Sequence, residues 1–175
     1  RVWVRKKILE KLKQQQFNLS QEALKPYFPA PKVVDGLFQI VQRLYGIQII
    51  ERQAPVWQND VRYFEIEDQG QVVGGFYFDL YARNGKRGGA WMSGFRSRVQ
   101  TANGLQKPIC YMVCNFTPPI GDQPALLTHD EVITLFHEFG HGLHHMLTEV
   151  DNISVAGTHG VAWDAVELPS QFMEF

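Results

Sequence analysis

The stretch TLFHEFGHGLHHM, residues 134–146, holds four of the six histidines in this chain of 175 residues. His137 and His141 are four positions apart, so on a helix their rings lie one turn apart and can point at the same spot. Glu138 lies between them in the sequence. In the pattern H-E-x-x-H, two imidazoles bind Zn²⁺ and the glutamate reaches a water molecule beside it. The stretch therefore predicts a zinc site built on one helix.

The residues around this motif favour a long helix over about 129–149. Thr128 and Glu131 form a T-x-x-E capping box, which is typical of a helix start. Gly140 and Gly142 each cost about 1 kcal/mol in a helix interior, and close approach of another chain segment would explain that cost. We expect one apolar face that packs into a core and an opposite face that presents the histidines. The apolar positions at helical spacing are Val132, Leu135, Phe136, Phe139, Leu143, Met146 and Leu147.

A catalytic zinc ion usually has a third protein ligand. The candidates downstream of the motif are His144, His145, Glu149, Asp151, His159, Asp164, Glu167 and Glu174. Asp164 and Glu167 make a D-x-x-E start, which places Glu167 in the first turn of a second helix that can fold back against the first. Glu167 is therefore the predicted third ligand. Asp164 and Glu174 have other roles open to them, as a cap or as carboxylates that orient a ligand histidine, and Pro169 leaves the boundary of this helix open.

The rest of the chain predicts an α+β fold in one domain. Helical periodicity covers residues 3–16 and 32–45, and Gly46 suits the end of the second of these helices. Short apolar or alternating runs then predict four or five strands, largely antiparallel. These runs are GIQIIE, VRYFEIED, QVVGGFYFDLYA, RGGAWMSGF and KPICYMVCNF. The expected parts are a helical segment 1–46, a small sheet 47–117 and the zinc-site helices 128–175.

Composition excludes several classes of partner. The formal net charge is −1 and charged residues make up 20% of the chain, so neither nucleic acid nor an anionic membrane surface is an expected partner.

Cys110 and Cys114 lie in a predicted strand, too far apart to bond to each other. We expect buried free thiols, a reducing compartment and a cytoplasmic location. The start at Arg1 and the end inside a helical stretch make us expect a part of a longer protein.

The motifs HEFGHGLHH and WDAVELPSQFME together resemble the M3 family of metallopeptidases, the group of thimet oligopeptidase and neurolysin. The resemblance covers nearly the whole chain. It implies a zincin-like core within a larger, mostly helical enzyme that hydrolyses short peptides. It also implies one Zn²⁺ per chain held by His137, His141 and Glu167, with Glu138 as the catalytic base. The segment RGGAW matches a strand that borders the substrate channel in the family.

The expected activity is that of an endopeptidase. A peptide could add to the edge of the sheet at residues 87–92, where Gly88 and Gly89 would let its backbone come close; a β-bulge is the alternative for that pair. His145 and His159 are local candidates for stabilising the oxyanion, whereas the resemblance favours groups beyond Phe175. A non-catalytic zinc-binding or peptide-binding module is the competing function. The carboxylate of Glu138 argues against it, because a structural zinc site has no use for a base beside the water.

Overall fold

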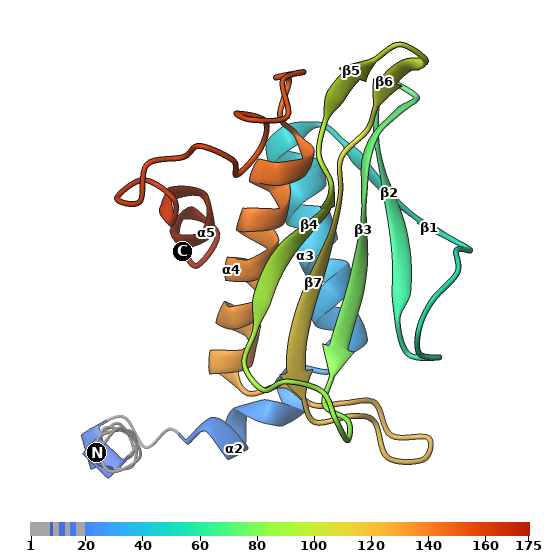
Figure 1. The fold of residues 1–175 in the computed structure, drawn as a ribbon. Coiled ribbons are helices and arrows are strands. Elements are labelled where there is room, and N and C mark those ends of the chain that lie inside the picture. The colour runs from blue at the N-terminus through green and yellow to red at the C-terminus, as the bar shows by residue number, and fades with distance from the viewer. Residues whose placement is uncertain (1–7, 9–10, 13–14, 17–19) are drawn as a thin grey trace.

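The computed structural model describes residues 8, 11–12, 15–16 and 20–175, and it has the predicted α+β fold (Figure 1). The helix expected over residues 3–16 lies largely outside the described residues. The helices, in chain order, are α2 (Gln21–Leu24), the 3₁₀ turn η1 (Lys25–Tyr27), α3 (Ala30–Tyr45), α4 (His129–Met146) and α5 (Leu168–Phe172). The strands are β1 (Gln48–Arg52), β2 (Arg62–Asp68), β3 (Gln71–Tyr81), β4 (Trp91–Arg96), β5 (Val99–Thr101), β6 (Gly104–Gln106) and β7 (Ile109–Phe116).

Five strands form the main sheet, in the order β1-β2-β3-β7-β4. The pairs β1–β2, β2–β3 and β4–β7 are antiparallel and β3–β7 is parallel. The prediction of a small, largely antiparallel sheet is therefore confirmed. Strands β5 and β6 form a separate two-stranded hairpin that the sequence did not predict. They are only three residues long, too short for an alternating pattern to stand out.

Helices α3 and α4 lie against one face of the sheet (Figure 1). The side chains between these layers include a cluster of aromatic rings from β2, β3 and α4. Phe76 lies edge-on to Phe139 of α4 at 5.3 Å between ring centroids, and both side chains have no exposed surface. This aromatic core fixes α4, and with it the histidine motif, against the sheet. Within the described part of the chain, no helix is both long enough and apolar enough to cross a membrane.

A buried ionic cluster holds the loop between β3 and β4. Asp79 of β3 accepts bonds from Arg83 at 2.6 and 2.8 Å, from Lys86 at 2.8 Å and from the Trp57 ring nitrogen at 2.9 Å. Lys86 also donates to the backbone oxygen of Tyr81. The bonds from these partners outweigh burial and lower the pKa of Asp79 to about 2. The cluster therefore sets where the chain enters β4.

Strand β4 begins at Trp91, four residues later than the sequence predicted. Gly88 and Gly89 lie in the preceding loop, so the prediction that they belong to the strand is wrong. They form no β-bulge either, because the pairing of β4 with β7 begins only at Trp91. The register shift of β4 lies further along, between Gly94 and Arg96. The prediction of a sheet edge is confirmed, because β4 is the last strand of the sheet and pairs with β7 alone.

Candidate metal site

The helix that carries the motif starts where the sequence predicts. Thr128 is the N-cap of α4: its hydroxyl accepts a bond from the backbone N–H of Glu131 at 3.2 Å, and its own N–H donates to the Glu131 carboxylate at 2.8 Å. The predicted capping box is confirmed. The helix ends at Met146, three residues before the predicted end. The Thr148 hydroxyl accepts from the N–H of Val150, a local bond that competes with the helix.

The two glycines of the motif both allow close approach, as their helical position predicts. A Cβ at Gly140 would lie 2.5 Å from the backbone oxygen of Pro169 and 2.6 Å from Cα of Ser170. A Cβ at Gly142 would lie 3.0 Å from the sulfur of Met112 in β7. Gly140 therefore lets α5 lie directly on α4, and Gly142 lets α4 lie directly on the sheet.

Three predicted ligands meet where α5 approaches α4. Nε2 of His141 lies 3.0 Å and Nε2 of His137 lies 3.3 Å from Oε2 of Glu167. The three ligand atoms all fall within 4.8 Å of one another, and no other such group of three occurs among the described residues. The two imidazole rings are nearly perpendicular, with centroids 5.0 Å apart.

Two further residues contact these candidate ligands. Nδ1 of His137 lies 2.6 Å from Oε1 of Glu174, which leaves Nε2 of that ring free to face Glu167. This contact is consistent with the orienting role that the sequence left open for Glu174. Ser170 is fully buried, and its hydroxyl lies 2.8 Å from Oε2 of Glu167. Sequence reasoning missed Ser170, because a serine after a proline carries no signal of its own.

The protonation states suit a cation. Burial lowers the pKa of His141, since the imidazolium form loses hydration. The hydrogen bond from Ser170 lowers the pKa of the Glu167 carboxyl. The neutral imidazole of His141 and the ionised carboxylate of Glu167 are donors of the kind that a three-ligand zinc site uses. The residues present fit a metal ion of this kind.

Glu138 follows His137 on α4 and is not part of this candidate group. It is 7% exposed, and burial raises the pKa of its carboxyl, while the polar backbone of Met92 beside it opposes the shift. Met92 belongs to the edge strand β4. Glu138 is thus a buried carboxyl on α4 that faces the edge strand β4.

The second helix differs in detail from the prediction. Residues 164–167 form turns, and α5 starts at Leu168 with Pro169 in its first turn. Glu167 is the N-cap residue instead of a first-turn residue, and Asp164 does not cap the helix. The reason is Pro169, which lacks an N–H and is favoured in the first turn of a helix.

The expectation that one face of α4 presents all four histidines is wrong for His145. Its side chain is 1% exposed, and Nε2 lies 2.8 Å from the backbone oxygen of Arg96 in β4. The physical reason is that α4 is covered on two sides, by β4 along one flank and by α5 along the other. This burial removes His145 from the candidates for an oxyanion donor. His159 is exposed, with Nδ1 3.2 Å from the backbone oxygen of Ala156.

Comparison with known proteins identifies the family of this chain. The family model "Peptidase family M3" matches residues 3–175. Oligopeptidase A of Escherichia coli is 58% identical over 168 residues, and the organellar oligopeptidase A of Arabidopsis thaliana is 51% identical over 173 residues. Dipeptidyl carboxypeptidase of E. coli is 42% identical over 168 residues. Each alignment covers 94% of this chain and 25%, 22% and 24% of the respective relative. The chain therefore spans about a quarter of the length of these relatives, and it belongs to peptidase family M3.

Proposed function

We propose that this chain forms the metal-binding core of a zinc-dependent endopeptidase that hydrolyses short peptides. His137, His141 and Glu167 are the proposed ligands of one Zn²⁺, and Glu138 is the proposed general base. The observation that carries the proposal is the convergence of the three ligand atoms within 4.8 Å beside a buried carboxyl that is not part of the group. The peptidase relatives support it.

A zinc ion held by His137, His141 and Glu167 would supply a Lewis acid for the scissile carbonyl and would lower the pKa of a bound water. Glu138 would accept the proton of the attacking water and deliver it to the leaving amine. The raised pKa of its carboxyl suits this task, because a base is most effective when its pKa approaches the working pH. The open edge of β4 would hold an extended peptide by backbone hydrogen bonds, next to the strand residue that contacts Glu138.

A purely structural zinc site is the competing reading. Structural sites close all four positions with protein ligands, whereas catalytic sites keep one position open. Among the described residues the candidate group has three members. This donor count, with Glu138 buried alongside, favours catalysis.

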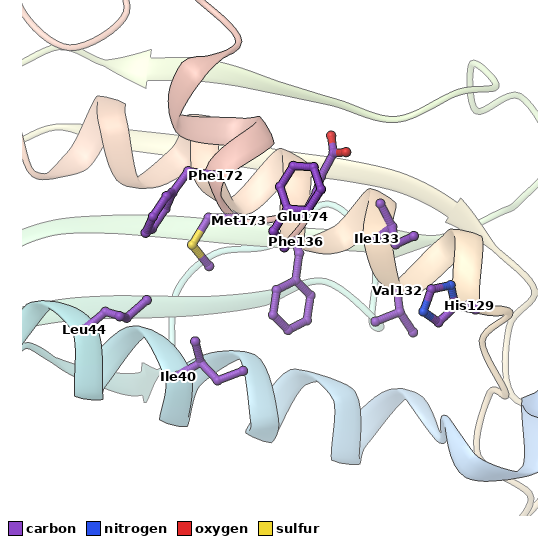
Figure 2. A pocket seen from close by; sticks show the side chains of 10 residues that line it. Ile40, Leu44, His129, Val132, Ile133, Phe136, Phe172, Met173 and Glu174 are labelled. Carbon is purple, nitrogen blue, oxygen red and sulfur yellow. The ribbon is translucent and has the colours of Figure 1, made fainter.

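This chain spans about a quarter of the length of its relatives, so further parts of the full-length protein are its expected partners. An apolar groove of about 510 Å³ lies between α3, α4 and α5, with Ile40, Leu44, Phe136 and Phe172 on its walls (Figure 2). Phe172 is 59% and Leu44 54% exposed. We propose that further parts of the full-length protein pack on this groove, because large exposed apolar side chains at one place favour burial against another surface.

We also propose a cytoplasmic location for the full-length protein. Cys110 and Cys114 are both free and buried, and burial raises the pKa of Cys114 to about 12. Free thiols persist in a reducing compartment. One relative carries the name "Probable cytosolic oligopeptidase A". Fractionation of cells that express the full-length protein tests this proposal, and recovery in a secreted or membrane fraction would contradict it.

The experiment on function separates metal binding from turnover in the full-length protein. Glu138→Gln should keep the metal and lose nearly all peptide hydrolysis, because the amide cannot accept a proton. Glu167→Ala should lose the metal as well. Zinc content and affinity are measured by metal analysis and chelator competition, and kcat/KM on a short quenched-fluorescence peptide.

Glu149→Gln is the matched control, since Glu149 is an exposed carboxylate that lies just past the end of α4. It should retain both zinc and activity. Near wild-type hydrolysis by Glu138→Gln would remove Glu138 from the role of base. Unchanged zinc affinity in Glu167→Ala would remove that residue from the ligand set.

A further inference from the structure

We propose that His145 is a positioning residue that holds the edge strand β4 against the metal-site helix, and so sets where a bound peptide lies relative to the metal and Glu138. This inference rests on the proposed function for its role in substrate binding. Its structural part, the attachment of β4 to α4 through one side-chain hydrogen bond, can be tested without any activity.

The first observation is the hydrogen bond itself. His145 is one of the few polar side chains buried in the described part of the chain, and its Nε2 lies 2.8 Å from the backbone oxygen of Arg96, the last residue of β4. A carbonyl oxygen only accepts, so Nε2 carries the proton and the ring is the donor. Among the described residues nothing meets Nδ1 within hydrogen-bond distance. A buried nitrogen without a partner destabilises a fold, so an apolar side chain would serve better if packing were the only role here.

The second observation is that the backbone on both sides of the ring makes room for it. A Cβ at Gly94 of β4 would lie 2.9 Å from Cε1 of His145. A Cβ at Gly157 would lie 3.0 Å from Nδ1, and Gly157 has a φ of +61°. The ring is therefore enclosed between the edge strand and the loop that leads to Glu167. The register shift of β4 between Gly94 and Arg96 occurs at this same place.

The third observation is what β4 contacts on either side of this attachment. The backbone of Met92, two residues before Gly94, lies beside the Glu138 carboxyl. Beyond the strand, Arg98 pairs with Asp151 at 2.6 Å, and the N–H of Gln100 donates to the backbone oxygen of Asp151 at 3.1 Å. β4 thus passes the Glu138 carboxyl at one end and is bonded to the loop after α4 beyond the other, with His145 between the two.

Loss of the His145 bond should affect the free edge of β4, where a peptide would pair. The opposite edge of β4 pairs with β7, which holds the strand in the sheet. The sheet hydrogen bonds do not fix the distance from β4 to α4, whereas His145 does so directly. If the bond is lost, a peptide that pairs with β4 keeps its partner strand but is displaced from the metal ligands and from Glu138.

The test compares His145→Phe, which fills the space without a donor, with His145→Gln, which retains an N–H donor at similar reach. In the full-length zinc enzyme, His145→Phe should raise KM for a short peptide roughly three- to tenfold, the scale of one hydrogen bond, with a smaller change in kcat. Amide hydrogen exchange over residues 91–96 should become faster, whereas zinc content should stay at the wild-type level. His145→Gln should restore KM and exchange toward the wild type.

Gly94→Ala perturbs the same contact from the strand side and should reproduce the effects of His145→Phe, which covers the case in which His145→Phe does not fold. Gly36→Ala is its control, because Gly36 lies in α3 and a Cβ there meets nothing within 4 Å. Unchanged exchange over 91–96 in both perturbing variants would overturn the proposal. So would a glutamine variant that behaves like phenylalanine, or a loss of zinc in proportion to the loss of activity. A wild-type protein without peptidase activity would refute the proposed function, while the exchange measurement would still decide the attachment of β4.

Discussion

Gly140→Ala adds a single methyl group inside the H-E-x-x-H motif, and the structure predicts that it disrupts the metal site from a distance. The new Cβ would lie 2.5 Å from the backbone oxygen of Pro169 and 2.6 Å from Cα of Ser170. Both are backbone atoms, so no side-chain rotation can relieve the contact. Helix α5 must move away from α4, and Glu167 at its N-cap must move with it.

The magnitude follows from these distances. Non-bonded carbon atoms rest at about 3.5–4.0 Å, so α5 must retreat by roughly 1 Å. Metal–ligand distances tolerate only about 0.2 Å. Glu167 would then be held out of reach of the point where His137 and His141 converge. We expect metal affinity to fall by at least about 10- to 100-fold, the range that loss of an outer-shell partner produces.

The assay is a zinc competition titration against a chromophoric chelator, on the full-length protein with and without the substitution. Gly36→Ala is the control for the helix effect of alanine: Gly36 lies in α3 and its Cβ would meet nothing within 4 Å. It should stabilise the fold by about 0.5–1 kcal/mol and leave zinc affinity unchanged. Gly142→Ala is the control within α4 and should have a milder effect, because it meets the flexible end of Met112. Wild-type zinc affinity in Gly140→Ala would refute the reasoning.

Three further predictions follow from the contacts around the site and the sheet. Glu174→Gln should weaken zinc affinity about 10-fold or more, because the amide is a poorer acceptor for Nδ1 of His137; the same chelator titration checks this, and an unchanged affinity would contradict it. Ser170→Ala should weaken zinc affinity to a smaller extent, since only one hydrogen bond to Glu167 is lost, and it should raise the pH at which zinc binding is half-maximal. For Asp79, the lowered pKa of about 2 contributes stability that is fully present above about pH 4 and is lost as the pH falls toward 2. Asp79→Asn should therefore cost roughly 2 kcal/mol at pH 7 and much less at pH 2, as measured by denaturant unfolding at both pH values; an equal cost at both would contradict the assignment.

Local patterns predicted the framework of the site well. The capping box fixed the first residue of α4, the i, i+4 spacing brought His137 and His141 together, and Gly46 ends α3 in the left-handed conformation. The alternating runs located all five strands of the main sheet. These features depend on residues within one or two turns of each other, where backbone geometry leaves few alternatives.

Features that depend on long-range approach were harder to predict. The sequence indicated that something approaches the glycines of α4, and the structure identifies α5 at Gly140 and β7 at Gly142. The burial of His145 could not be read from the helix alone, because it depends on β4, some 50 positions earlier in the chain, as a covering element.

The same distinction explains how the candidate site holds together. The two histidines are fixed by one helix, so their spacing survives most changes elsewhere in the fold. The position of Glu167 depends on the contact of α5 with Gly140 and on the bond from Ser170, and Glu138 is enclosed where β4 lies against α4. The proposed third ligand and the proposed base therefore depend on two separate packing contacts on opposite flanks of α4. Substitutions at the α5 contact should act on zinc affinity, whereas substitutions at the β4 contact should act on peptide binding with the metal retained.

A double substitution, Gly140→Ala with Gly94→Ala, should show the two effects independently. The changes in the logarithms of zinc affinity and of the rate of hydrogen exchange over residues 91–96 should be near-additive. Strong coupling between them would show that the two flanks of α4 move as one unit.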